Sequence, residues 1–590
     1  MDISGTLVLT LIAATIPFVV CIFAAFNPAS QVRDVGDYYL YDRELDVDSF
    51  LKSTIGYSLQ VAAIALFITW TFSYGIWCLV VCAAWGAGYW IVARLVQKKR
   101  FEAFLGTGRK ARENKPNEIA TIHGYIQSRL GPCPDLIKRL TILIVSLASV
   151  IGLGGTMLTE IYYGTSFFTS AIGIAAPDFL LETIIHLFIL FFGLLYVLWG
   201  GYRASVFIDR FQTPIAYVAF GIFALGLATF TKNAATSTSA VWIVGSLLVI
   251  YVGLLFGRLR LLKKTMPTAL WNKAISYLTF LPLIFLSLGC ILFLWSFHLP
   301  KDLWKIMFPH VDSTIGFGIA GAISLSVANA IWQLIDISSL QRLQSLDIKE
   351  VKEHRSNIVS AFQWIGIETA AGWAIIVAAS LLLAVGGFSI ADDQVSTVVL
   401  HFFQGPGTFS LLLPVFIFAV VVFMVSTVSC FIAALSYIAR YDIAPTLKLL
   451  PPGGQSLGEN DIAIARLTTL VVVVVLYACY SVFSAALGHT SIAVILYAVY
   501  AFQLAITPTV LISLFMLDRP VSAWAAIGST IFGMGVALWT AMQPLPPSWL
   551  AFIGNDSWYV IPPIAVILVS CVAYLFIYGL MEAAKTSSHN

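Results

Sequence analysis

Long runs of apolar residues recur along this chain of 590 residues and are separated by short polar stretches. Most runs are at least as long as the roughly 20 residues that a helix needs to cross a bilayer. The strict alternation of apolar and polar residues that a membrane β-strand needs is absent from the sequence. We therefore predict fifteen membrane-spanning helices, at residues 5–26, 53–73, 75–96, 138–168, 181–199, 211–231, 239–257, 274–297, 314–335, 358–387, 409–438, 464–486, 490–516, 522–542 and 559–582.

The composition supports an all-α polytopic membrane protein. Hydrophobic residues make up 59% of the chain and charged residues only 11%, with a mean hydropathy of +0.90, whereas a soluble domain has about 25% charged residues. No basic stretch is interleaved with aromatic residues, so we expect no nucleic-acid partner. The eight cysteines occur singly, which disfavours a zinc site or a disulfide framework. The P-loop pattern of ATP-driven pumps is also absent.

Lysine and arginine residues are distributed unevenly among the predicted loops. They concentrate at 97–118, 258–264 and 342–355, whereas 388–408 and 543–558 contain none. Because basic loops stay on the cytoplasmic side, we predict a multi-pass protein of the plasma (inner) membrane with its N-terminus outside and its C-terminus in the cytoplasm. The first span lacks a basic n-region, so we interpret it as a retained helix and not as a signal peptide.

Ionisable residues inside the predicted spans are unusual, because charge is costly in a bilayer and usually serves a function or finds a partner. Glu160 and Glu368 lie deepest; each could relay a proton or cation, or could be an interhelical hydrogen-bond partner. Glu182 and His186 are one helical turn apart and could pair with each other. For Asp209, close to Arg203 and Arg210, we expect a structural ion pair. Asp336 lies inside a span, and Asp442 near a cytoplasmic end.

Hydroxyl residues are concentrated in the apolar segment FMVSTVSCFIAALS, residues 423–436. In membrane helices such hydroxyls usually donate to a carbonyl one turn earlier. The adjacent pair Ser426 and Thr427, in the middle of a span, could instead hold a small cation such as sodium. A second, broken helix would then supply carbonyl oxygens near the midplane.

Six segments, in the same order along the chain, resemble the sodium:solute symporter family. They are DYYLYDREL (37–45), IHGYIQSRLG (122–131), EIYYG (160–164), LWGGYRASVFIDRFQ (198–212), LQRLQS (340–345) and MVSTVSC (424–430). The chain is most similar to the sodium/proline symporter branch, from which it diverges. The resemblance implies a LeuT-like fold, in which two inverted five-helix repeats form the core and extra helices pack around it.

The resemblance also implies a sodium site. The hydroxyls of Ser426 and Thr427 and the carbonyls of Phe423, Gly56 and Leu59 match its ligands. Gly56 suits an unwound helix segment because glycine tolerates the required backbone geometry.

The same comparison suggests substrate-facing residues and a limit on the substrate. The candidates are Gln60, Glu160, Asn329 and Gln333. Ser58 stands where the proline branch has an aspartate, so proline is disfavoured as the solute.

We divide the chain into three regions. Residues 1–36 form an extra N-terminal transmembrane helix, and residues 37–520 form the core, with a hairpin inserted at about 239–297. Residues 521–590 form peripheral C-terminal helices and a short tail.

These features predict a sodium-coupled secondary active symporter that imports a small organic solute by alternating access. Two alternatives remain, a membrane solute sensor that signals to a separate partner and a proton-coupled transporter. An enzyme is disfavoured because no span pairs a nucleophile with a histidine at suitable spacing. We expect the solute and the lipid membrane as partners, and no obligatory protein partner.

Overall fold

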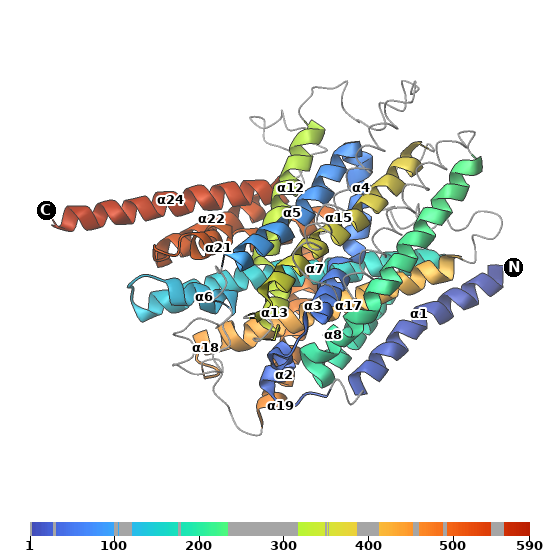
Figure 1. Cartoon of the computed structure of the whole chain (residues 1–590), viewed down its shortest axis with the longest axis horizontal. Helices are drawn as coiled ribbons and strands as arrows, with labels where there is room; N and C mark the ends of the chain where they lie inside the picture. The colour runs from blue at the N-terminus through green and yellow to red at the C-terminus, as the bar shows by residue number, and fades with distance from the viewer. Residues whose placement is uncertain are drawn as a thin grey trace.

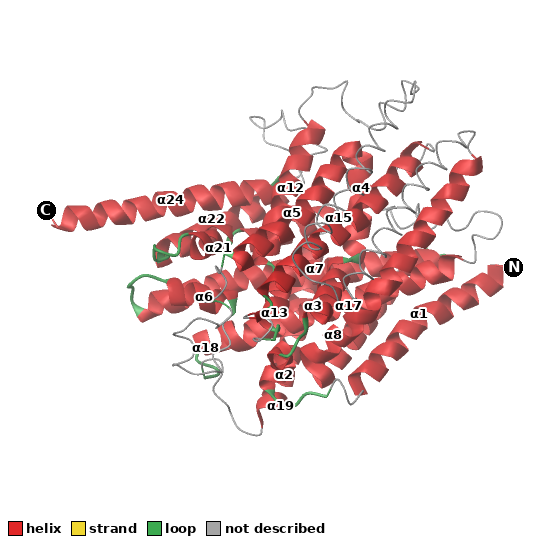
Figure 2. Ribbon diagram, viewed as in Figure 1, coloured by secondary structure: helices red, strands yellow, loops and turns green. Residues whose placement is uncertain are grey.

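The computed structural model describes residues 3–26, 31–98, 104, 121–174, 179–233, 317–347, 351, 353–385, 412–451, 460–487, 492–543 and 560–589. Apart from two isolated β-bridges, the regular structure of this part of the chain is helical (Figure 2). Ten of its helical segments are long and apolar enough to cross a membrane. The prediction of an all-α, multi-pass membrane protein is therefore confirmed.

The N-terminal half contains eight α-helices in the described residues. They are α1 (Ile3–Phe26), α2 (Val35–Leu40), α3 (Val47–Ser58), α4 (Val61–Tyr74), α5 (Cys78–Gln97), α6 (Ile122–Arg129), α7 (Asp135–Ala171) and α8 (Phe179–Asn233).

The C-terminal half continues with α12 (Phe317–Ile335), α13 (Ile337–Gln344), α15 (Arg355–Val385), α17 (Leu412–Ile438), α18 (Ala444–Thr446), α19 (Asp461–Leu487), α20 (Ile492–Leu504), α21 (Thr507–Phe515), α22 (Ala523–Met542) and α24 (Pro562–His589). A short π-helix, η5 (Ala439–Ile443), links α17 to α18.

The predicted spans differ from these helices in two ways. The spans 53–73 and 490–516 are each interrupted, giving α3 and α4 in the first case and α20 and α21 in the second. The spans 181–199 and 211–231 are joined in α8, which is kinked at Gly201. The inserted hairpin at about 239–297 and most of the basic loop 97–118 lie outside the described residues.

The core consists of two five-helix repeats. The first comprises α3 with α4, then α5, α7 and the two parts of α8; the second comprises α12 with α13, then α15, α17, α19 and α20 with α21. Each repeat therefore begins with a helix that is broken near its middle. The helix α1 packs outside on α8 and α17, and α22 packs with α24 near the opposite end of the molecule (Figure 1).

The second helices of the two repeats, α5 and α15, pack against each other at a pair of glycine residues. A Cβ atom on Gly86 of α5 would lie 2.5 Å from the carbonyl oxygen of Gly366 of α15, and one on Gly366 would lie 2.6 Å from that of Gly86. Small residues let two backbones approach closely, which is how membrane helices gain packing energy when both lipid and protein are apolar. The two repeats are consequently in direct backbone contact here.

Gly201 bends α8 toward the start of the core. Its φ of +54° and ψ of −150° are open to glycine but strained for other residues. A Cβ atom there would lie 2.6 Å from the carbonyl oxygen of Tyr38 in α2. The kink thus brings the second part of α8, which carries Asp209, against the segment that leads into α3.

Candidate functional site

The first core helix is interrupted at Leu59 and Gln60. The α3 helix ends at Ser58, Leu59 has φ −94° and ψ 84°, and Gln60 is extended before α4 begins at Val61. The Leu59 N–H donates to the carbonyl oxygen of Gly56 at 3.1 Å. Helix ends leave carbonyl and N–H groups without intrahelical partners, so the break presents peptide groups in the interior of the protein.

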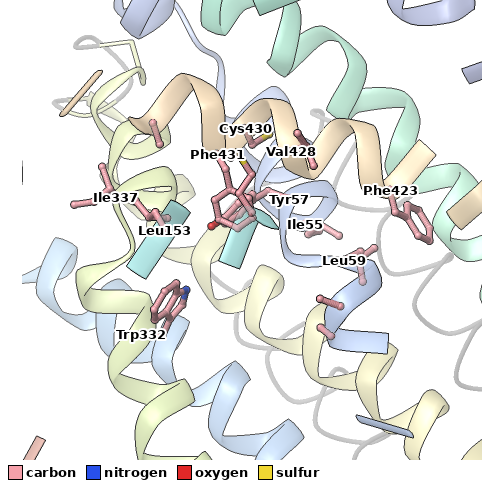
Figure 3. Packing of buried hydrophobic residues seen from close by; sticks show 14 of the residues in the cluster. Ile55, Tyr57, Leu59, Leu153, Trp332, Ile337, Phe423, Val428, Cys430 and Phe431 are labelled. Carbon is pink, nitrogen blue, oxygen red and sulfur yellow. The ribbon is translucent and has the colours of Figure 1, made fainter. Parts of the chain in front are cut away.

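The helix α17 packs beside α3. The rings of Tyr57 in α3 and Phe431 in α17 meet edge to face, with centroids 5.5 Å apart. Figure 3 shows this pair, with Leu59 near the end of α3 and Phe423 on α17. The two elements that carry the predicted sodium ligands are therefore in contact.

The hydroxyl groups of α17 have different partners. Ser429 donates to the carbonyl oxygen of Ser426 at 2.6 Å, and Ser436 donates to that of Ala433 at 3.2 Å, as packing hydroxyls do. Ser426 instead donates to the Oδ1 atom of Asp209 at 2.5 Å. Thr427 is fully buried, and its Oγ1 atom has no hydrogen-bond partner among the described residues.

A buried oxygen without a partner costs free energy, and a hard cation surrounded by oxygens is one way to satisfy it. Thr427 therefore fits the role of a sodium ligand. The structure places Gly56 and Leu59 at the end of α3, and Phe423 and Ser426 on α17 with Thr427. Coordination of sodium by these five residues stays a prediction.

Glu160 of α7 contacts the other side of the break. Its fully buried carboxylate accepts hydrogen bonds from the Val61 N–H through Oε1 at 2.5 Å and from the Ala62 N–H through Oε2 at 2.8 Å. These are first-turn N–H groups of α4, which lack intrahelical acceptors. The acidic residue that the sequence indicated as substrate-facing thus caps the second half of the broken helix.

The remaining predicted substrate residues lie at the break and on α12, which packs against α4. Gln60 is the residue before α4. Asn329 accepts from the Tyr500 hydroxyl through Oδ1 at 3.1 Å, while its buried Nδ2 atom has no partner among the described residues. The Nε2 atom of Gln333 is likewise buried and unpartnered there. Substrate binding by these residues stays a prediction.

The second repeat has an equivalent break at Asp336, between α12 and α13. The Asp336 carboxylate accepts from the backbone N–H groups of Ser338 and Ser339, each at 3.1 Å, and from the Ser339 hydroxyl at 2.6 Å. Tyr57 of α3 also donates to it at 3.1 Å. Asp336 therefore caps α13 and ties it to α3.

Asp209 forms the structural ion pair that we expected, but in the protein interior and with an arginine far along the chain. It is fully buried, and its Oδ2 atom lies 3.0 Å from the guanidinium of Arg342 in α13. It also accepts from the hydroxyl of Ser53 at 2.6 Å, besides that of Ser426. The carboxylate thus joins α3, α8, α13 and α17, which sequence proximity cannot reveal because these partners are distant along the chain.

Arg203 pairs elsewhere. Its guanidinium lies 2.7 Å from Asp37 and 3.4 Å from Glu44, and it stacks 4.2 Å above the ring of Tyr41. Asp209 therefore pairs with Arg342 and not with Arg203, while the side chain of Arg210 lies outside the described residues. The kink at Gly201 explains the difference, because it places Arg203 against α2 while Asp209 faces the core.

Two other predicted ionisable sites have contacts within their own helices. Glu368 accepts a hydrogen bond from the indole of Trp364 one turn earlier. The predicted Glu182–His186 contact has an oxygen-to-nitrogen distance of 3.7 Å, which is longer than a hydrogen bond.

One buried cluster was missed by sequence reasoning. His123 of α6 lies 2.8 Å from an Asp442 oxygen through Nδ1 and 2.9 Å from the Ser149 hydroxyl through Nε2. All three side chains are buried, so the cluster fastens α6 to α7 and η5. The sequence placed Asp442 near a cytoplasmic end but contained no local signal for His123 as its partner, since the two are 319 residues apart.

The sequence matches no protein-family model and no curated protein. Solved structures do match. A substrate-bound, outward-open Na⁺-coupled sialic acid symporter aligns with a TM-score of 0.56 over 97% of both chains, at 13% identity. A nucleobase-cation-symport-1 family transporter in a closed conformation aligns with a TM-score of 0.45 over 94% of this chain and 96% of that chain, at 14% identity.

The chain has the LeuT-type transporter fold. Transporters of this type bind substrates and coupling ions near the midplane, where broken helices meet. The breaks at Leu59–Gln60 and Asp336 mark the equivalent region of this LeuT-type chain.

Proposed function

We propose that this protein is a sodium-coupled secondary active symporter that imports a small organic solute by alternating access. The observation that carries the proposal is the buried Thr427 oxygen, which has no hydrogen-bond partner in the described part of the chain and lies on a helix that packs against a broken core helix. The fold, shared with a Na⁺-coupled sialic acid symporter, supports it. Sodium is here a co-transported substrate.

Sodium binding would link the break of the first core helix to α17. Asp209 accepts a hydrogen bond from the Ser426 hydroxyl. The lone pairs of that hydroxyl oxygen therefore remain available to bind a cation. Because the ligands come from two packed elements, sodium binding favours the conformation that holds these elements together. A solute that prefers the same conformation is then bound more tightly when sodium is present.

We further propose that the chain is a divergent relative of the sodium:solute symporters, nearest the sodium/proline branch, in the plasma (inner) membrane with its N-terminus outside. The motif residues support this relationship by their positions. EIYYG supplies Glu160 at the first break, LQRLQS supplies Arg342, and MVSTVSC supplies Thr427.

Sodium coupling is tested first by thermal unfolding of the purified full-length protein. We expect sodium chloride to raise the melting temperature saturably, compared with potassium or choline chloride at equal ionic strength. Metabolites that add to the stabilisation only when sodium is present are then tested for uptake into proteoliposomes under an inward sodium gradient. Equal stabilisation by sodium and potassium, together with uptake that ignores the sodium gradient, would refute the proposal.

A further inference from the structure

The N-terminus of a helix attracts anions, because its first N–H groups lack partners and the helix dipole is positive there. In transporters with broken helices, such N-termini inside the membrane point at anionic groups of the substrate. The two helices that begin the core repeats each have such an N-terminus after their break, at Val61 of α4 and at Ile337 of α13.

The first of these N-termini already holds a carboxylate of the protein. Glu160 belongs to α7, and each of its oxygens accepts one N–H group of the first turn of α4, from Val61 and Ala62. The side chain is fully buried. The place that a substrate carboxylate would take at this helix is therefore occupied.

The second N-terminus is occupied in the same way. Asp336 accepts the N–H groups of Ser338 and Ser339 and is fully buried. Two internal carboxylates thus occupy the N-termini that follow the breaks in the first helix of each repeat.

The helix after the first break and the helices that carry Asn329 and Tyr500 provide no cation for an anionic solute. The sequences of α4, α12 and α20 contain neither lysine nor arginine. Arg342 of α13 is bound to Asp209, Ser53 and the carbonyl oxygen of Ser338. An anion brought close to Glu160 would lose hydration, and the N–H groups of Val61 and Ala62 that could replace it are already bound.

Neutral hydrogen-bond donors are present instead. The Nδ2 atom of Asn329 and the Nε2 atom of Gln333 are buried without partners in the described part of the chain. Both belong to α12, which packs against α4 and more extensively against α5, where Gln333 lies beside Gly88. Buried donors of this kind are satisfied by hydroxyl or carbonyl oxygens.

We propose that Glu160 and Asp336 stand in for the anionic group of a substrate, and that the transported solute is uncharged and rich in hydroxyl or carbonyl oxygens. This inference rests on the proposed transport function and narrows its substrate class. It places amino acids and sugar acids outside that class, because their carboxylates would compete with the protein's own.

The first test removes the carboxylate from the N-terminus of α4 and then supplies a small carboxylate from solution. In Glu160→Ala, formate is small enough to occupy the place of the missing carboxylate. We expect formate to raise the melting temperature of this full-length variant saturably, by roughly 2 °C or more, relative to chloride at equal ionic strength. The wild type and Glu160→Gln, in which the position is filled, should show no such rise.

Two results of this test would overturn the inference. Equal stabilisation of the wild type by formate would mean that the N-terminus is still open to anions. A folded Glu160→Ala protein that formate does not stabilise would mean that α4 has no anion site.

A second test uses only the wild type, in case Glu160→Ala fails to fold. L-lactate, L-proline and N-acetylneuraminate are compared with chloride in sodium buffer, and none should stabilise the protein. Saturable stabilisation by any of these carboxylates would refute the proposed substrate class. Failure of sodium coupling is seen separately, in the sodium titration without solute, so the two proposals can fail independently.

Discussion

A single hydroxyl group carries the proposed ion coupling. Thr427→Val keeps the shape of the side chain and removes the unpartnered oxygen. We expect the sodium concentration for half-maximal stabilisation to rise about tenfold or more, since a lost buried polar partner costs on the order of 1–3 kcal/mol. The measurement is a sodium titration of the melting temperature of the purified variant.

Ser436→Ala is the matched control for this prediction. Ser436 lies on the same helix but already donates to the carbonyl oxygen of Ala433, so its removal should leave the sodium titration unchanged. A sodium dependence identical to wild type in both Thr427→Val and Ser426→Ala would show that these hydroxyls only pack.

At the same scale, Asp42 should make stability depend on pH. The pKa of Asp42 is raised to about 6, mainly by partial burial and to a smaller extent by repulsion from the nearby carboxylates of Asp34, Asp37 and Glu44. The pKa of an unfolded aspartate is about 3.9, so ionising Asp42 is more costly in the folded protein. Its contribution to stability is present below about pH 4 and is lost as the pH rises to about 6.

Asp42→Asn should therefore gain stability over the wild type as the pH rises. Asparagine also tolerates the left-handed backbone at this position, where φ is 51°. Melting temperatures measured from pH 4 to 8 should show a difference near zero at pH 4 that grows until about pH 6 and then stays constant. A difference independent of pH would contradict this prediction, and Asp48→Asn, whose carboxylate faces Lys52 at 2.5 Å, should show no such gain.

At the scale of elements, the close contact of α5 and α15 predicts sensitivity to a single methyl group. Gly86→Ala would place a Cβ atom 2.5 Å from the Gly366 carbonyl oxygen, and backbone cannot yield as a side chain does. We expect a loss of about 1–3 kcal/mol in stability, typical of overpacking. Thermal unfolding of the variant measures the loss.

Gly535→Ala in α22 is the control, because a Cβ atom there has no neighbouring atom within 4 Å. This substitution should be neutral or slightly stabilising, since alanine has a higher helix propensity than glycine. Equal losses in the two variants would show that backbone contact between α5 and α15 is not what makes Gly86 sensitive.

The buried Asp209–Arg342 pair predicts strong coupling between elements. Asp209→Asn would leave the fully buried guanidinium of Arg342 without its counter-charge, and removing one partner of a buried pair costs about 3–5 kcal/mol. The double variant with Arg342→Gln should lose less than the sum of the two single losses. Additive losses in unfolding experiments would contradict the coupling, and Lys52→Ala, which breaks a partly exposed pair, should cost at most about 1 kcal/mol.

At the scale of the whole molecule, the distribution of basic residues predicts which loops face the cytoplasm. A cysteine at position 110, in the basic loop, should be protected from a membrane-impermeant thiol reagent in intact cells, whereas one at position 392 should react. Replacing Lys110 and Asp392 one at a time, in a background without native cysteines, makes the comparison direct. The reverse pattern would invert the predicted topology.

The sequence predicted the positions of helices better than the contacts between polar side chains. It predicted an unwound segment at Gly56 within the first core helix, and the observed break lies nearby, at Leu59 and Gln60. It predicted a structural ion pair for Asp209 but not its partner, because Arg342 is 133 residues away along the chain. It gave no signal that Glu160 would cap α4, since that contact spans 99 residues.

The sequence by itself determined the all-helical, membrane-spanning character of the protein, because a run of apolar residues is a local property and the bilayer imposes helix formation on it. Only the tertiary structure decided which polar groups meet. The partners of Glu160 and Asp209, and the burial of the Thr427 oxygen without a partner among the described residues, are set by how the repeats pack and where their first helices break. Such contacts depend on the arrangement of elements far apart in the chain, and no local pattern encodes them.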